Sequence, residues 1–306
     1  MFTGDTYLQP DIPDPVLADD VVLRIARRHL AKVVSVTAVD ESGGEARVYV
    51  CDGDIVVKTQ RPHRLRARTS LAKEVLILEH LAALDGLAIP RVLGYGNDSD
   101  VEYIVMTRIP GIALEAAKLE SQARNMVLEN LGETLRRIHE ADQTALDESS
   151  LIPGDKDGAD VRERVASGFD ALIAAVEAHG SVAGMDLRNI ADVCLAGLPV
   201  EFRPVVLHSN PGAAHCLVDP RTGLFAGLID FADAYRSHPA FDIRVWSSLA
   251  DSRPLLSGYS RRGPLGEGFE AVRRCGIVLT QLRDVARGSR DLQGAFRSIE
   301  RLLDES

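Results

Sequence analysis

The pattern of apolar and polar residues divides the chain into two unlike parts. In the first part, apolar residues recur at the spacing of a helix over residues 15–30 and 70–84. Shorter β-rich runs predict strands, and in one of them Val48 and Val50 alternate with polar neighbours. These runs cover residues 33–40, a hairpin over 41–60 with an Asp-Gly-Asp turn, 89–98 and 101–109. The first part therefore predicts a small, strand-rich unit.

Pro110 and Gly111 end this pattern, and the chain after them is mostly helical in character. Helical periodicity covers residues 121–142, 160–180, 186–198 and several segments from about Phe269 onward, and a β-rich island occupies residues 205–234. The change at the Pro-Gly pair predicts an α+β protein with two lobes. The N-terminal lobe, residues 1–108, is small and strand-rich, and the C-terminal lobe, residues 109–306, is larger and mostly helical.

Charge and composition narrow the classes of function. The chain has 306 residues, of which 45% are hydrophobic, so it is long enough to bury a large core. Its formal net charge of -10 argues against nucleic-acid binding, which requires basic surfaces. An acidic surface mildly favours a cationic small molecule as a partner, although solubility alone explains the same charge.

The cysteines and the apolar runs indicate a cytoplasmic protein without a membrane partner. Cys51, Cys194, Cys216 and Cys275 lie far apart and form no CxxC pair, which fits reduced thiols better than a disulfide framework or a zinc site. No apolar run approaches the ~20 residues that span a bilayer. No signal peptide is expected, because no basic segment followed by an apolar run stands at the amino terminus.

Three features of the strand-rich part suggest a phosphate-binding site. Gly43 and Gly44 lie between two predicted strands, where glycine lets the backbone approach phosphate groups. Lys58, on the following strand, would supply a cation, and Glu74 on the next helix would hold that lysine in place. Each feature also has a plainer interpretation: an ordinary turn, an exposed lysine and a solvated glutamate. Glu79 lies on the same helix, so the choice of Glu74 depends on the register.

The β-rich island carries the second half of the pattern. Asp230 directly follows an apolar strand and precedes Phe231 and a small residue, the position of a carboxylate that holds magnesium over phosphates. Upstream, a loop reads His208-Ser209-Asn210, then four residues, then His215. A hairpin is expected to connect this loop to Asp230.

The chain resembles the aminoglycoside phosphotransferase family, which has a protein-kinase-like fold. The resemblance runs from about Ala38 to Leu282 and is carried by Lys58, Glu74, Asp230 and the segments LGETLRRIHEAD, VEYIVMTRIPG, IDFADAYRSHPAFDI and GYSRRGPLGE. It implies ATP, or another nucleoside triphosphate, and Mg²⁺ as cofactors, with Met106 and Thr107 in the hinge that holds adenine through backbone hydrogen bonds. It also implies that Asp242 is a buried structural carboxylate.

The chain departs from the family at two positions of the catalytic loop, which in the family reads His-Gly-Asp-x-x-x-x-Asn. Asn210 occupies the aspartate position, and an asparagine side chain does not accept a proton at neutral pH. Loss of a positioned base costs on the order of 10²–10⁴ in rate. His215 occupies the position of the metal-binding asparagine, and imidazole suits zinc or manganese better than magnesium. Asp233 would replace the missing carboxylate, and His208 or His215 would act as the base. A surface or capping role for Asp233 and a core role for His208 are the plainer interpretations.

Two functions therefore compete. The first is an ATP-dependent phosphotransferase that moves a γ-phosphoryl group to a hydroxyl of a small molecule, with Asn210, His215 and Asp230 at the reaction centre and with turnover impaired by the first two. The second is a catalytically inactive kinase-like protein that binds a nucleotide, a small molecule or a partner. A protein kinase is less well supported, because no arginine follows His208 and no Ala-Pro-Glu segment follows Asp230. The acceptor pocket is expected among the helices of residues 121–198 and those at the carboxyl end.

Overall fold

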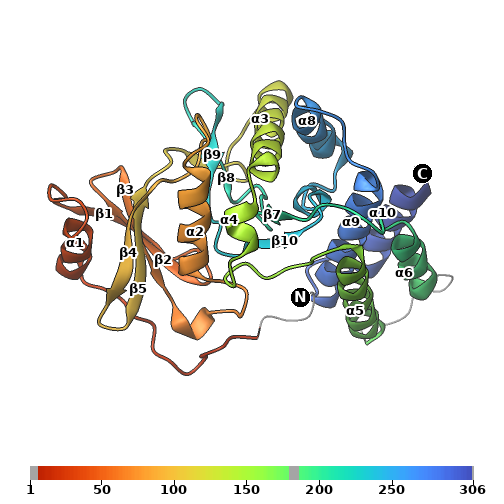
Figure 1. Ribbon diagram of the computed structural model, residues 1–306, viewed down its shortest axis with the longest axis horizontal. Helices are drawn as coiled ribbons and strands as arrows, with labels where there is room; N and C mark the ends of the chain where they lie inside the picture. Colours follow the sequence, from red (N-terminus) through yellow and green to blue (C-terminus); the bar gives the residue numbers. More distant parts are fainter. Residues whose placement is uncertain (1–5, 179–185, 305–306) are drawn as a thin grey trace.

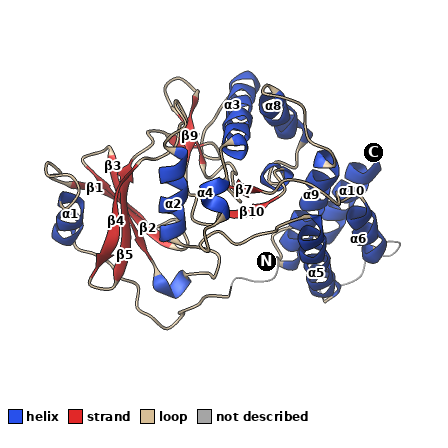
Figure 2. Cartoon of the chain, viewed as in Figure 1, coloured by secondary structure: helices blue, strands red, loops and turns tan. Residues whose placement is uncertain are grey.

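The protein consists of two lobes that lie side by side, as seen in the computed structural model (Figure 1), which describes residues 6–178 and 186–304. Strands dominate the N-terminal lobe and helices dominate the C-terminal lobe (Figure 2). This confirms the predicted α+β, two-lobed fold. One hydrophobic core continues from Leu71 and Ile104 in the first lobe to Leu131 in the second, and the boundary at residue 108 remains a prediction.

The N-terminal lobe is built on an antiparallel sheet with the strand order β1-β2-β3-β5-β4. Its strands are β1 (Val36–Asp40), β2 (Ala46–Cys51), β3 (Ile55–Gln60), β4 (Val92–Asp98) and β5 (Val101–Thr107). The turn between β2 and β3 contains Asp52 and Gly53, both with positive φ, as a tight hairpin requires. The resulting register pairs Lys58 with Val48 on one side and Ile104 on the other, in the middle of the sheet.

Two helices cover the opposite faces of this sheet. Because side chains alternate along a strand, Val57 and Lys58 of β3 point to opposite faces. Val57 packs in a cluster with Val22 and Ile25 of α1 (Asp19–Arg27). On the other face, Val56 belongs to the core that includes α2 (Leu71–Leu81). Lys58 has the same parity as Val56, so its side chain points toward α2 and the C-terminal lobe.

The C-terminal lobe is a bundle of helices packed around two small sheets. Its long helices are α3 (Ser121–Glu140), α5 (Gly158–Glu177), α6 (Leu187–Ala196), α8 (Leu249–Ser260), α9 (Phe269–Ala286) and α10 (Leu292–Asp304), and its short helices are α4 (Thr144–Asp147) and α7 (Ala240–Ile243). The N-terminal lobe has one short 3₁₀ helix, η1 (Pro62–Arg64). α3 and α8 approach closely at two glycines. A Cβ atom added to Gly132 would lie 2.0 Å from the Leu255 oxygen, and one added to Gly258 would lie 1.9 Å from the Glu129 oxygen.

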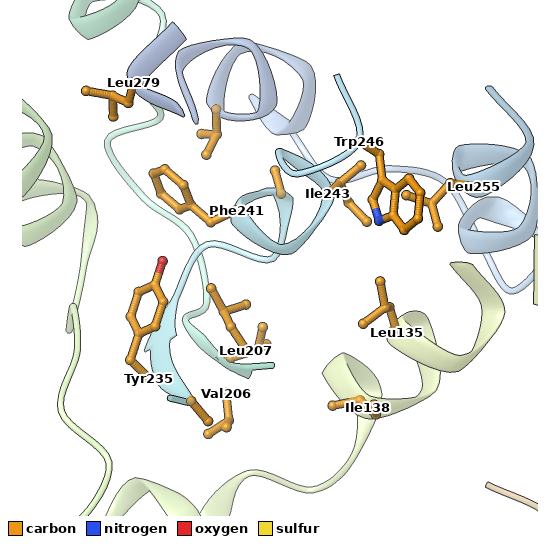
Figure 3. Close-up of a cluster of buried hydrophobic side chains, with 14 of the residues drawn as sticks. Leu135, Ile138, Val206, Leu207, Tyr235, Phe241, Ile243, Trp246, Leu255 and Leu279 are labelled. Atoms are coloured by element: carbon orange, nitrogen blue, oxygen red, sulfur yellow. The ribbon is translucent and has the colours of Figure 1, made fainter. Parts of the chain in front are cut away.

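The two small sheets supply the loops that face the N-terminal lobe. One sheet has the order β6-β8-β9, and β7 pairs with β10 in the other. Their bounds are β6 (Ile112–Ala113), β7 (Val205–Leu207), β8 (Cys216–Val218), β9 (Phe225–Leu228) and β10 (Tyr235–Ser237). Figure 3 shows β7 and β10 in the core of this lobe, with Phe241, Trp246 and Leu135 among the buried side chains. The packing of β7 and β10 in this core positions the loop that follows β7.

Most predicted elements are confirmed, but α8 was not foreseen as a helix. Pro254 lies inside it. Proline has no N–H and disfavours the helical conformation of its predecessor, so it normally marks a break. The helix forms all the same, and its Gly258 packs closely against α3, so tertiary packing overrides the local preference of proline.

Candidate active site

The candidate site lies where β3, α2 and the loop after β9 meet, around the ammonium group of Lys58. Lys58 Nζ donates to Glu74 Oε2 at 2.7 Å and to Asp230 Oδ1 at 2.8 Å. The side chains of Lys58 and Glu74 are almost completely buried, whereas that of Asp230 is 40% exposed. The structure therefore brings together three of the predicted site residues, and the open side of the group is the carboxylate of Asp230.

α2 is attached to the loop that carries Asp230. Ser70 caps the helix, because its hydroxyl accepts the amide of Lys73 at 3.3 Å, and its own amide donates to the Ala232 oxygen at 3.2 Å. One turn later, Glu74 Oε1 accepts the amide of Phe231 at 3.3 Å. Glu74 is thus the glutamate of α2 that faces Lys58, and it binds the lysine with one oxygen and the loop with the other.

The charges of this group reinforce each other. Burial alone would lower the pKa of Lys58, but the carboxylates of Asp230 and Glu74 outweigh it and hold the pKa above its usual value. Burial would raise the pKa of Asp230, but the charge and the hydrogen bond of Lys58 hold it well below its usual range. Lys58 therefore stays a cation and Asp230 an anion throughout the neutral pH range, as binding of phosphate and of a hard cation requires.

The loop between β7 and β8 rests on a buried carboxylate. Asp242 is fully buried, and its oxygens accept the amides of His208 at 2.8 Å and Ser209 at 2.7 Å. His139 Nε2 lies 3.0 Å from Asp242 Oδ2. Burial would raise the pKa of Asp242, but the hydrogen bond and charge of His139 lead the contributions that keep the pKa low. This agrees with the structural role that the family resemblance implies for Asp242.

His208 is a core residue of this loop. Its ring is fully buried, with Nε2 2.9 Å from the Ile229 oxygen and Nδ1 accepting the amide of Asn210 at 3.3 Å. Burial lowers the pKa of His208 to about 4, so the ring is neutral at neutral pH. Both of its nitrogens are engaged, and it is therefore not available as a base.

Asn210 and His215 lie together at the open side of the site. His215 Nδ1 is 2.8 Å from the backbone oxygen of Asn210. Because a carbonyl oxygen only accepts, Nδ1 carries a proton, and in the neutral form of the ring the lone pair is then at Nε2. That atom lies 3.4 Å from Asp230 Oδ2. Ser209 and Asp230 both have positive φ, of 82° and 72°, a strained conformation that is typical of functional loops.

The remaining predicted nucleotide contacts lie at the edges of the N-terminal lobe. Gly43 and Gly44 fall in the turn between β1 and β2, and a Cβ atom added to Gly44 would meet no atom within 4 Å. The turn is therefore uncrowded at Gly44. Met106 and Thr107 end β5, where the amide and the hydroxyl of Thr107 both bond to the backbone of Arg91 at 2.9 Å. These groups hold β4 against β5, and the adenine contact assigned to the two residues remains a prediction.

Asp233 does not join the reaction centre. Its carboxylate accepts the hydroxyl of Thr69 at 2.5 Å and pairs with Arg66 at 3.1 Å and Arg68 at 3.2 Å. These contacts commit Asp233 to the connection between η1 and α2. The structure therefore favours a structural role over the replacement carboxylate that the sequence left open.

The sequence analysis did not identify two residues whose side chains bond to the backbone of this loop. Arg244 donates to the Ser209 oxygen at 3.1 Å, and Trp246 Nε1 donates to the Pro211 oxygen at 3.0 Å. The sequence offered a weak signal for this support, since the only tryptophan of the chain follows Asp242 by four positions. A tryptophan N–H that is buried requires an acceptor.

The order of these elements and contacts agrees with the comparison to known families. The model of the phosphotransferase enzyme family matches residues 36–275 of the chain. The chain belongs to this family. The match runs from β1 into the first turns of α9, and it therefore includes the Lys58–Glu74–Asp230 group and the loop of this phosphotransferase family member. No curated protein sequence matches the chain.

Solved structures of phosphotransferases share the fold. The apoenzyme of macrolide 2'-phosphotransferase MphH from Brachybacterium faecium is 22% identical with a TM-score of 0.64, over 92% of this chain and 98% of that one. The GDP complex of wild-type aminoglycoside 2'-phosphotransferase-IIIa is 18% identical with a TM-score of 0.64, over 94% and 98%. ADP-bound aminoglycoside phosphotransferase APH(2'')-Ib is 17% identical with a TM-score of 0.61, over 94% and 97%. At identities this low, the structural similarity establishes a common fold and says nothing of the substrate.

Among the residues that the structure describes, no helix is long and apolar enough to cross a membrane.

Proposed function

We propose that the protein transfers the γ-phosphoryl group of ATP to a hydroxyl group of a small molecule. The observation that carries the proposal is the Lys58–Glu74–Asp230 group, in which a buried cation is held between two carboxylates from separate elements. Phosphoryl transfer depends mainly on positioning and on neutralisation of charge, and these residues supply both. Membership of the phosphotransferase enzyme family supports the same reaction class.

Each member of the group has a distinct role in this proposal. Lys58 binds phosphate oxygens, since its ammonium is charged and is fixed by Glu74. Asp230 directs its second oxygen toward the open side, where the phosphates would lie. The open turn at Gly43 and Gly44 allows the backbone to cover the phosphates.

The residues at the open side fit a divalent cation. Asp230 Oδ2 and the bare Nε2 of His215 are 3.4 Å apart, and both are electron-pair donors. The described residues contain no group of three or more His, Cys, Asp or Glu side chains arranged for a metal, so the phosphates would supply further ligands. A bound cation would neutralise charge on the phosphates. The nitrogen donor favours manganese or zinc over magnesium.

Asn210 positions the acceptor in this proposal and does not remove its proton. Its side chain is exposed at the open side, and its backbone is fixed at both ends by the rings of His208 and His215. An asparagine amide accepts a hydrogen bond from a hydroxyl group but does not take its proton. The reaction would therefore proceed with a rate penalty of about 10²–10⁴, because a positioned base is missing.

A second function, nucleotide or ligand binding without transfer, rests on the same two positions. Asn210 and His215 both replace groups of the reaction centre. Asp233, the candidate for a replacement carboxylate, is committed to Arg66 and Arg68. The Lys58–Glu74 ion pair would serve nucleotide binding in either case.

A phosphorylation screen separates the two functions. The protein is incubated with ATP, Mn²⁺ or Mg²⁺ and a panel of hydroxylated small molecules, and the products are analysed by mass spectrometry for a gain of one phosphate. The proposal expects at least one product, which disappears with Lys58→Ala. Nucleotide binding without any phosphorylated product or release of ADP would favour the second function.

A further inference from the structure

A cavity of about 240 Å³ lies between the start of α8, α9 and α10, and its lining carries an unusual set of polar groups. Arg273 and Arg301 are part of the lining together with Gln281 and three serines, of which Ser298 lies on α10. The lining contains no aspartate or glutamate. A cavity of this composition attracts a negatively charged group.

Each of the two arginines has a guanidinium nitrogen without a hydrogen-bond partner among the described residues. Glu270 binds Arg273 through Nε at 2.8 Å and Nη2 at 2.5 Å, and no group of the described residues bonds its Nη1. Arg301 donates Nε to the Arg297 oxygen at 3.0 Å, and within the described residues it forms no ion pair. Arginine presents planar N–H donors that match a carboxylate or a phosphate. The charge of the lining therefore exceeds what its own partners neutralise.

Gln281 adds a buried acceptor without a partner. Its side chain is 2% exposed, and Nε2 donates to Ser298 Oγ at 3.1 Å across the interface of α9 and α10. The carbonyl oxygen Oε1 is buried and has no hydrogen-bond partner. A buried acceptor of this kind costs free energy until a donor reaches it. A hydroxyl group of a ligand in the cavity would be such a donor.

The cavity adjoins the loop of the candidate active site through one short segment. Arg244 and Trp246 bond to the backbone of Ser209 and Pro211, on either side of Asn210. The next residue after the tryptophan, Ser247, already lines the cavity. A Cβ atom added to Gly276 of α9 would lie 2.9 Å from the Arg244 side chain, so α9 packs tightly against this segment.

We propose that this cavity binds the acid group of a small hydroxylated organic anion, which is the acceptor of the phosphoryl group. The acid group lies against Arg273 and Arg301, and a hydroxyl donates to Gln281 Oε1. The inference deepens the proposed function and rests on it, because an acceptor requires phosphoryl transfer. It differs from the cationic acceptor that the acidic composition mildly favours, which stays a prediction.

Ligand binding without nucleotide tests the site separately from the reaction. Gluconate, glucose and glucosamine are similar in size and hydroxyl content but differ in charge, and each is titrated into the protein by calorimetry. We expect gluconate to bind at least tenfold more tightly than glucosamine, and Arg301→Ala to weaken gluconate at least tenfold. Arg297→Ala, an exposed arginine of the same helix outside the lining, is the matched control and should change nothing.

Two further arms sharpen the result. Gln281→Glu replaces the unpartnered acceptor with a carboxylate of the same shape, and it should abolish gluconate binding while a thermal unfolding curve reports that the fold remains. Glucose 6-phosphate in place of gluconate shows whether phosphate or carboxylate is the preferred acid group. Equal binding of gluconate and glucosamine, or equal effects of Arg301→Ala and Arg297→Ala, would overturn the proposal. Failure of ATP binding would leave these titrations unaffected and would refute the proposed function alone.

Discussion

Replacement of Asn210 by aspartate should accelerate the reaction. The two side chains have nearly the same shape, and the contacts that fix this position come from its backbone. The amide donates to His208 Nδ1 at 3.3 Å and the carbonyl oxygen accepts His215 Nδ1 at 2.8 Å. Asn210→Asp preserves both, and the exposed side chain should change stability by no more than about 0.5 kcal/mol. The variant therefore alters the chemistry of one atom at the open side of the site.

The size of the effect follows from what a carboxylate adds. A positioned base contributes about 10²–10⁴ in rate, which at about 1.4 kcal/mol per factor of ten lowers the barrier by roughly 3–5 kcal/mol. The neighbouring carboxylate of Asp230 would oppose part of this gain, since like charges repel. The ammonium of Lys58 already faces Asp230 and reduces that repulsion. We therefore expect the lower end of the range, about a hundredfold.

Release of ADP, coupled to oxidation of NADH, measures this change without knowledge of the acceptor, because water serves as a poor substitute for the hydroxyl. Asn210→Ala is the matched control, since it removes the hydrogen-bonding amide and supplies no base, and it should be slower than the unaltered protein. An Asn210→Asp variant that is folded and no faster, or slower, would refute the role assigned to this position.

Three other predictions follow from the same geometry. Lys58→Ala and Asp230→Ala should each weaken ATP binding at least tenfold in calorimetry, because each removes one side of the ion pair that faces the phosphates; unchanged affinity in both would disprove their roles. His215→Asn should shift the metal preference of ATP binding from Mn²⁺ toward Mg²⁺, and the ¹⁴N coupling to bound Mn²⁺ in pulsed electron paramagnetic resonance should disappear. Burial lowers the pKa of His208 and of His238 to about 4, so the unfolded chain binds more protons than the folded chain between pH 6.5 and 4. The free energy of unfolding therefore has its full value above pH 6.5 and decreases as the pH falls, by about 2 kcal/mol per histidine at pH 5. In urea unfolding, His238→Gln should lose about 2 kcal/mol less between pH 7 and pH 5 than the unaltered protein.

The sequence was sufficient to predict the lobes and the central group of the site. Lys58 ends a short apolar run after the hairpin turn, and Asp230 follows an apolar run directly, so both positions are readable from short-range patterns. Glu74 required the register of a helix, which the apolar face of residues 70–84 supplied. These residues meet because the chain places them on three adjoining elements in the expected order.

The support of the catalytic loop was not predictable from such patterns. His139, Arg244 and Trp246 act through side-chain hydrogen bonds to Asp242 and to the loop backbone, and the partners lie up to 103 positions apart. Local propensity contains no information about which donor meets which acceptor at that separation. The cavity beside Gln281 escaped prediction for the same reason, since its lining combines faces of two helices with a loop.

α8 shows the limit of local rules in the other direction. Pro254 predicts a break, and tertiary packing of α3 against Gly258 overrides that preference. Asp233 likewise stands three positions from Asp230, yet Arg66 and Arg68 hold it away from the reaction centre.

The central claim is that Lys58, Glu74 and Asp230 form a site that binds a nucleotide. Calorimetric titration of ATP into the protein, with Mn²⁺, with Mg²⁺ and with a chelator, tests it most directly. The account predicts binding with a divalent cation, tighter with Mn²⁺, and an affinity at least tenfold lower with the chelator or with Lys58→Ala. Absence of ATP binding under all three conditions would contradict it.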